Sequence, residues 1–193
     1  MQLSAYNTKR NFKGTSEPEG KIDHEGKLRF VVQRHDASHL HYDFRLELGG
    51  VLKSWAVPKG PSMSPRDKRL AMMVEDHPVS YIGFEGDIPE GHYGAGNVIV
   101  WDKGNFVPVD AHHTPLTEKQ ALAGIENGEL KFLLKGKKLK GEFVLVHLQK
   151  DDAKNNSWLL IKHNDEYAVD AYNSENYTPA AARKASEKKR QKS

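Results

Sequence analysis

The sequence predicts a mainly β fold of about eight strands with one or two short helices, arranged as a compact antiparallel β-barrel or as a curled sandwich. Short runs of strand-like composition recur between turn residues from residue 28 onward. Clear helix signals mark a single segment, 117–126. At 193 residues, the chain is long enough for one well-buried domain and short for two.

The expected elements follow from periodicity and turn residues. Gly49 and Gly50 stand between two strand-like runs and predict a two-residue hairpin turn. In the expected helix, Thr117 and Gln120 have the spacing of a capping box, and Gly128 follows as a stop. The expected strands are 28–34, 40–48, 51–57, 70–75, 97–102, 129–134, 139–148 and 157–163.

Composition divides the chain into an amino-terminal arm at 1–20, a barrel domain at 21–172 and a basic flexible tail at 173–193. Residues 180–193 contain six basic side chains and one acid, so this segment carries +5 and the rest of the chain −2. A protein that only coats duplex DNA usually has a basic face across its body. We therefore expect any contact with nucleic acid to be local, at a few cations around one pocket, with help from the tail.

The composition also excludes several classes of site. The chain has no cysteine, which rules out disulfides and thiolate metal sites and predicts a cytoplasmic protein. No run approaches the roughly 18 apolar residues of a membrane span, and the first ten residues lack the apolar centre of a secretory signal. We expect a monomer that does not associate with membranes.

The strongest chemical signal lies in residues 33–47. With the two-residue period of a strand, one face of this stretch is apolar and predicts a core contact. That face carries Leu40, Tyr42, Phe44, Leu46 and Leu48. The opposite face sets His41, Asp43, Arg45 and Glu47 about 7 Å apart in succession, from a rise of ~3.3 Å per residue.

His41 and Asp43 are neighbours on the polar face, a spacing that suits two ligands of one metal ion. His35 precedes the strand and could fold back over it as a third ligand. Two imidazoles and a carboxylate suit Mn, Zn, Co or Fe and leave positions open for substrate. Arg45 lies just beyond and could bind an anionic oxygen. The alternative is a solvated polar face, on which a histidine such as His39 lies at the surface.

Two later segments carry further candidates. The loop 57–69 is rich in proline and glycine, so Lys59 and Arg69 could form a phosphate clamp, or could simply be solvated. His77 follows an apolar run and precedes Pro78, a position that suits a general acid, although the pattern alone favours a surface histidine. The glycine-dense segment 85–96 has neither P-loop nor dinucleotide-binding spacing and predicts a tight, irregular turn.

Four motifs follow one another along the chain. They are His35-x5-His41-Tyr-Asp43-Phe-Arg45-Leu-Glu47, Trp55-Ala-Val-Pro-Lys59-Gly-Pro, Glu75-Asp-His77-Pro, and Phe84-Glu-Gly-x-Ile-Pro-Glu-Gly-x-Tyr-Gly-x-Gly-x-Val. Together they closely resemble the 3′-phosphoesterase domain of the bacterial and archaeal DNA ligase D family. The resemblance runs from about residue 9 to residue 165, nearly the whole chain.

The resemblance implies a β-barrel whose active site lies in a polar concavity. It implies removal of a 3′-terminal ribonucleoside to leave a 3′-phosphate, followed by hydrolysis to a 3′-hydroxyl. Manganese is the implied metal, with zinc or cobalt as alternatives, and the implied ligands are His35, His41 and Asp43. The other implied site residues are Arg45, Lys59 and Arg69 as phosphate contacts, His77 as a transition-state donor, and Glu75, Tyr81 and Glu17 in support.

The amino-terminal arm matches the family motif with one change. Where the family often has Arg-Asp-Phe-x-x-Thr-x-Glu-Pro, this chain has Arg10, Asn11, Phe12, Thr15, Glu17 and Pro18. Asn11 thus replaces an acid and carries no charge. We expect Asn11 and Glu17 to act together in ribonucleoside removal.

The resemblance also implies partners: DNA or RNA/DNA 3′ ends, and ligase and polymerase modules or a protein that binds broken ends. No ligase or polymerase module fits in 193 residues, so we expect a free-standing protein or an excised domain. Two alternatives to a phosphoesterase remain. One is a non-catalytic module that binds nucleic-acid ends around a structural metal. The other is a cupin-like Fe(II) oxygenase, although the cations favour a phosphorylated substrate.

Overall fold

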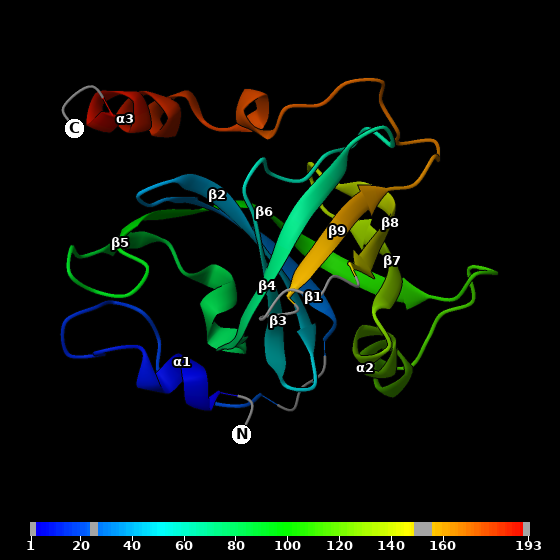
Figure 1. The fold of residues 1–193 in the computed structure, drawn as a ribbon, viewed down its shortest axis with the longest axis horizontal. Coiled ribbons are helices and arrows are strands. Elements are labelled where there is room, and N and C mark those ends of the chain that lie inside the picture. The colour runs from blue at the N-terminus through cyan, green and yellow to red at the C-terminus, as the bar shows by residue number, and fades with distance from the viewer. Residues whose placement is uncertain (1–2, 24–26, 149–155, 191–193) are drawn as a thin grey trace.

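The computed structural model describes residues 3–23, 27–148 and 156–190 (Figure 1). Within these residues, nine strands form one antiparallel sheet, accompanied by short helices. The strands are β1 (Arg29–Asp36), β2 (Leu40–Leu48), β3 (Val51–Val57), β4 (Lys68–Pro78), β5 (Gly86–Ile88), β6 (Gly96–Val109), β7 (Glu129–Lys135), β8 (Lys140–His147) and β9 (Ser157–Lys162). The helices are α1 (Ser4–Thr8), η1 (Val79–Gly83), α2 (Glu118–Glu126), η2 (Ser174–Tyr177) and α3 (Ala180–Arg190).

The sheet closes on itself into a barrel, which confirms the predicted fold class. Its strand order is β1-β2-β3-β4-β9-β8-β7-β6-β5, and β1 also pairs with β6. Eight strands therefore form a closed ring, and the short β5 extends the sheet beyond β6. No helix in the described parts of the chain is long and apolar enough to cross a membrane.

Two local predictions are confirmed in detail. Gly49 and Gly50 turn the chain between β2 and β3 with φ of 66° and 76°, a conformation that glycine adopts without steric cost. Thr117 caps α2: its hydroxyl accepts from the Gln120 backbone N–H, and the Gln120 side chain accepts in return from the Thr117 backbone N–H. Gly128 then follows the helix with φ of 89°.

The structure departs from the expected strands at β4, β5 and β6. Strand β6 continues to Val109, past Gly104 and Pro108, because it pairs first with β1 and then with β7. A Cβ on Gly104 would lie 2.2 Å from the Lys135 carbonyl oxygen, so the close approach of β6 to the end of β7 requires glycine at this position. The three-residue β5 was not expected, because the segment reads as irregular turn.

Two hydrophobic clusters hold the strands together. The larger cluster fills the barrel with side chains from all eight strands of the ring, among them Phe44, Trp55, Phe132 and Phe143. The smaller cluster joins α1, η1 and β5 to the outer faces of β3 and β6. Strand β2 therefore has its apolar face inside the barrel. Its polar face is also largely buried and lies on the side of the smaller cluster. The expectation of a core-facing apolar stripe is confirmed.

The carboxy-terminal segment contains helix α3 at residues 180–190, within the part of the chain that the composition predicts to be a basic flexible tail. Figure 1 shows α3 running along one side of the barrel toward the tip of the β1–β2 hairpin. The Ser186 hydroxyl donates to Asp36 at 2.6 Å and accepts from Arg34 at 2.9 Å. Arg34, only 2% exposed, also forms a two-pronged ion pair with Glu175. The division of the chain into arm, barrel and tail remains a prediction.

We expect Glu175→Ala to lower the free energy of unfolding by about 2 kcal/mol, because it leaves the buried Arg34 guanidinium without its carboxylate. Chemical denaturation measures this change. Glu166→Ala, at an exposed position, serves as the control and should change stability by less than about 0.5 kcal/mol. Equal stability of the two variants would show that the Arg34–Glu175 pair does not fasten the carboxy-terminal segment.

Candidate active site

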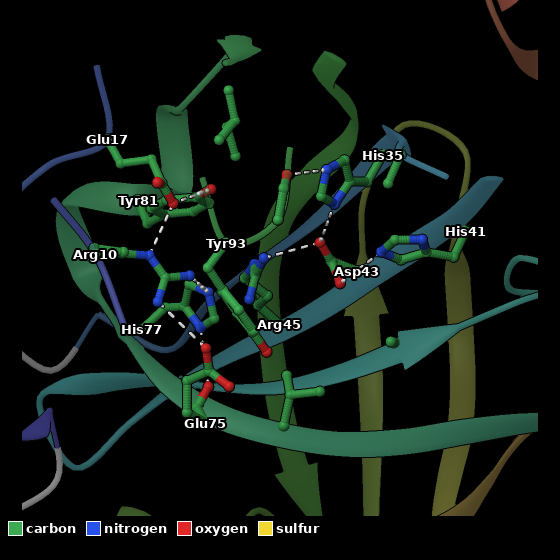
Figure 2. A pocket seen from close by; sticks show the side chains of 15 residues that line it. Arg10, Glu17, His35, His41, Asp43, Arg45, Glu75, His77, Tyr81 and Tyr93 are labelled. Atoms are coloured by element: carbon green, nitrogen blue, oxygen red, sulfur yellow. Dashed lines mark hydrogen bonds and ion pairs between the residues drawn. The ribbon is translucent and has the colours of Figure 1, made fainter. Parts of the chain in front are cut away.

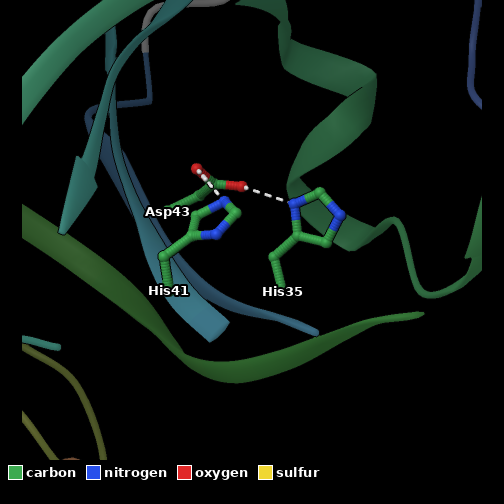
Figure 3. Close-up of side chains that lie close together, drawn as sticks. All are labelled: His35, His41 and Asp43. Carbon is green, nitrogen blue, oxygen red and sulfur yellow. Dashed lines mark ion pairs between the residues drawn. The ribbon is translucent and has the colours of Figure 1, made fainter. Parts of the chain in front are cut away.

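The register of β1 and β2 brings three predicted ligands together. His35 lies directly opposite His41 in the antiparallel pair, and their ring centroids are 4.7 Å apart. Asp43 follows on the same face of β2: its carboxylate lies 3.6 Å from His35 Nδ1 and 3.7 Å from His41 Nε2. One ligand atom from each residue lies within 4.8 Å of the others (Figure 3). These three side chains are called the metal triad below.

Backbone carbonyls orient both imidazoles of the triad. His35 Nε2 lies 2.8 Å from the Gly94 carbonyl oxygen, and His41 Nδ1 lies 2.9 Å from the His39 carbonyl oxygen. A carbonyl oxygen only accepts, so each of these nitrogens carries the proton. His35 Nδ1 and His41 Nε2 are then the ring nitrogens that face Asp43, and these nitrogens could ligate a shared metal ion. The donor set of two imidazoles and one carboxylate fits Mn, Zn, Co or Fe.

Asp43 is held as a carboxylate. Burial alone would raise its pKa, but the positive charge of the Arg45 guanidinium outweighs burial and places the pKa below its usual range. The Arg45 Nη2 group donates to Asp43 at 3.0 Å, and Arg45 Nε donates to Gln33 Oε1 at 2.8 Å. Asp43 is therefore available as an anionic ligand at neutral pH.

Arg45 also presents a donor that the described residues leave unused. Its Nη1 is buried and has no hydrogen-bond partner within the described parts of the chain. Leaving a buried guanidinium nitrogen without a partner is costly. Arg45 lines the same pocket as the metal triad (Figure 2).

A second group of side chains lines the other side of the pocket. Arg10 is its centre: Nε donates to Glu17 at 2.9 Å, Nη1 donates to Glu75 at 3.2 Å, and Nη2 lies 3.2 Å from His77 Nε2. The Tyr81 hydroxyl, itself buried, donates to Glu17 at 3.1 Å. Figure 2 shows this group facing the triad across a cavity of 280 Å³, which is at the small end of ligand pockets.

A β-bulge in β4 affects which of its side chains line this pocket. The register of β3 and β4 shifts between Leu52 and Ser54, which pair with His77 and Val74, so β4 carries one extra residue there. A bulge changes which side chains share a face. Val74, Glu75 and His77 consequently all line the pocket, although strict alternation would separate Val74 from the other two.

His77 is a neutral imidazole in this environment. Burial lowers its pKa well below the usual value, and the positive charges of Arg45 and Arg10 lower it further. The hydrogen bonds agree: Nδ1 lies 2.9 Å from the Glu75 carbonyl oxygen and carries the proton, so Nε2 accepts from Arg10. In the protein without substrate, His77 is therefore not in the protonated form that a general acid requires.

Lys59, Arg69 and Asn11 do not line this pocket in the described structure. On β4, Arg69 shares a face with the core residue Ala71, opposite to the face that carries Val74. Its guanidinium binds Asp67 and the Tyr172 carbonyl instead. Lys59 is exposed, and the exposed Asn11 side chain accepts from the Lys13 backbone N–H.

Sequence reasoning gave no role to Arg10, Tyr93 or the Gly94 carbonyl, all of which belong to the site. Arg10 stands in the arm motif without a predicted role. The glycine-dense segment has turn composition, and in the structure Gly94 adopts a positive φ and its carbonyl contacts His35. Arg10 and Tyr93 both belong to motifs that match the family, and this membership is the sequence feature from which their place in the site could have been predicted.

Comparisons with known proteins identify the family. The model of the DNA Ligase D 3′-phosphoesterase domain matches residues 33–147, which include the metal triad, Arg45, Glu75, His77 and Tyr81. The chain belongs to the DNA ligase D 3′-phosphoesterase domain family. Arg10 and Glu17 lie outside the matched segment, and the structure brings them to it.

Relatives of the phosphoesterase domain are multifunctional proteins. The chain is 51% identical over 166 residues to the multifunctional non-homologous end joining protein LigD of Pseudomonas aeruginosa, covering 84% of this chain and 19% of that protein. It is 36% identical over 167 residues to LigD of Mycolicibacterium smegmatis, covering 86% and 21%. For LigD of Mycobacterium tuberculosis H37Rv the identity is 35% over 184 residues, covering 94% and 22%. The chain thus spans about a fifth of the length of these relatives.

The buried neutral His77 predicts a particular dependence of stability on pH. Below the unfolded-state pKa of about 6.5, His77 binds a proton in the unfolded chain but not in the folded protein. The free energy of unfolding therefore falls as pH falls. In metal-free protein, His77→Gln should remove this loss, which amounts to at most about 1.4 kcal/mol per pH unit between pH 6.5 and the lower folded pKa. Denaturation curves of both proteins from pH 7.5 to 5 measure it. Parallel stability curves would show that His77 titrates normally.

Proposed function

We propose that this chain is a metal-dependent phosphoesterase that removes 3′-phosphates and 3′-terminal ribonucleosides from DNA ends and leaves a 3′-hydroxyl for break repair. Membership of the phosphoesterase family supports this, as do relatives named for non-homologous end joining. The observation that carries it is the unpartnered, buried Arg45 Nη1 beside the metal triad. A non-catalytic binding module would not need a general acid candidate such as His77 within the same pocket.

The metal triad would hold Mn²⁺, with Zn²⁺ or Co²⁺ as alternatives. When bound, the ion would act as a Lewis acid that neutralises charge on the phosphate. Asp43 supplies the anionic ligand, and the Gly94 and His39 carbonyls keep the two imidazoles in the ligating tautomer. Other groups of the chain then bind and orient the phosphate.

The two arginines of the pocket act on the phosphate oxygens. Arg45 would donate from Nη1, the nitrogen that nothing in the described residues satisfies, while Nε and Nη2 keep the side chain fixed to Gln33 and Asp43. Arg10 is held by Glu17 and Glu75 and places a second positive charge beside His77. Lys59 and Arg69 remain proposed phosphate contacts, for phosphates of the nucleic acid outside this pocket.

His77 would hold the proton for the leaving oxygen. In the substrate-free pocket its pKa is low because two arginines surround a buried ring. A bound phosphate brings negative charge next to those arginines, which favours protonation of Nε2. The protonated ring would then donate to the oxygen that leaves as the 3′-hydroxyl. Water is the proposed nucleophile.

The proposed protein partners are ligase and polymerase modules, or a protein that binds broken ends.

Loss of the metal should abolish the reaction. With chelator, or in His41→Ala, hydrolysis of a DNA primer that ends in a 3′-phosphate should stop, because the phosphate charge is no longer neutralised. Addition of Mn²⁺ should raise the melting temperature of the wild-type protein but not of His41→Ala. The matched control is His39→Ala, since that exposed side chain lies outside the site and only its carbonyl is used. Full turnover by chelated protein would contradict a metal-dependent reaction.

Arg45→Lys tests the phosphate contact separately from the metal. Lysine keeps the charge but loses the fork of three nitrogens, so kcat/KM on the 3′-phosphate primer should fall about 10²- to 10³-fold. Calorimetric Mn²⁺ affinity shows whether the triad survives, because Arg45 also contacts Asp43. Arg66→Lys, at an exposed position, is the control. Unchanged kcat/KM in Arg45→Lys would exclude Nη1 as the phosphate donor.

A further inference from the structure

Tyr93 is an exposed aromatic ring in the wall of the pocket. It lines the cavity together with Arg10, Arg45 and His77, yet it is 50% exposed. The other tyrosine among the described lining residues, Tyr81, is only 3% exposed and is packed into the smaller hydrophobic cluster. An exposed tyrosine at the mouth of a phosphate pocket therefore needs an explanation that packing does not supply.

The loop that carries Tyr93 is fixed beside the metal triad. Gly91 and Gly94 adopt φ of 84° and 77°, which side-chain-bearing residues rarely do. The Gly94 carbonyl accepts from His35, so the residue next to Tyr93 is bonded to a triad member. Figure 2 shows the Tyr93 side chain extending from this loop across the pocket. The backbone that carries the ring is therefore held beside the metal triad.

The surroundings of the ring suit nucleic acid. The Lys9 ammonium lies 4.7 Å from the centre of the Tyr93 ring and 3.4 Å from its hydroxyl, and it also pairs with Glu75 at 3.1 Å. The Arg10 guanidinium carbon lies 5.5 Å from the same ring centre. Aromatic rings interleaved with cations bind nucleic acid by stacking on bases while the cations bind phosphates.

We propose that Tyr93 stacks on the nucleobase of the last retained nucleotide, the one whose 3′ oxygen carries the phosphate in the pocket. This inference rests on the proposed function, and it assigns a substrate contact to that site. The retained nucleotide is chosen because it is present in both reactions, whereas a leaving nucleoside exists in only one. Tyr93 thereby makes the reaction depend on a base, in addition to the phosphate that the arginines recognise.

The test compares two DNA primers that end in a 3′-phosphate, one with a normal terminal base and one with an abasic terminal sugar. Wild-type protein should show kcat/KM about tenfold higher on the primer with the base, through KM, because stacking contributes to binding. Tyr93→Leu should lose that preference, and Tyr93→Phe should keep it. Tyr167→Leu, at another exposed tyrosine outside the pocket, should behave as wild type.

The outcomes separate the two proposals. If wild-type protein hydrolyses neither primer, the proposed function fails. If it hydrolyses both equally, or if Tyr93→Leu keeps the preference, the assignment of Tyr93 fails while the function stands. A loss in Tyr93→Leu confined to primers that end in a ribonucleoside would place the ring against the leaving nucleoside and would also overturn the assignment. The wild-type comparison does not depend on how well the variants fold, and Mn²⁺-induced thermal shifts check their metal triads.

Discussion

The antiparallel register of β1 and β2 is the constraint on which the candidate site depends. It sets His35 directly across from His41, so two imidazoles from different strands reach one carboxylate. A slip of one residue would turn His35 to the opposite face of the sheet. The register is secured on the other face of β2, where the apolar stripe that includes Phe44 is buried in the barrel. Packing of the core therefore fixes the position of the ligands.

The remaining pocket is arranged around buried charge. Asp43 is compensated by Arg45, while Glu17 and Glu75 compensate Arg10, and each of these pairs lies largely out of water. Unpaired charges in such a place would be costly, so the pairs hold one another in position. Two groups of this pocket remain available to a ligand. The Nη1 nitrogen of Arg45 has no hydrogen-bond partner among the described residues and can donate to an oxygen, and the neutral His77 ring is a base that can take up a proton. Both suit a phosphate group.

Local patterns in the sequence were enough to predict a mainly β fold of about eight strands, the capped helix α2, the Gly49-Gly50 turn and the alternation of β2. They were not enough where tertiary packing decides. Helix α3 contains small and charged residues without an apolar stripe, and it docks through Ser186 to Arg34 and Asp36. The arm reaches the pocket because Tyr6 is buried against Tyr81, a contact that no periodicity shows. Residues 70–74 are uniformly apolar, so this run shows no alternation from which the face of β4 that carries Arg69 could be predicted.

The most direct test of a metal-dependent phosphoesterase is a titration of Mn²⁺ into metal-free protein, with bound metal and release of phosphate from a 3′-phosphate primer measured on the same samples. Phosphate release should rise with the metal bound and saturate at about one ion per chain, since the described residues contain one such triad. A chain with His35, His41 and Asp43 all replaced by alanine should neither bind the ion nor release phosphate. Phosphate release by that triple variant would contradict a metal-dependent reaction at the triad.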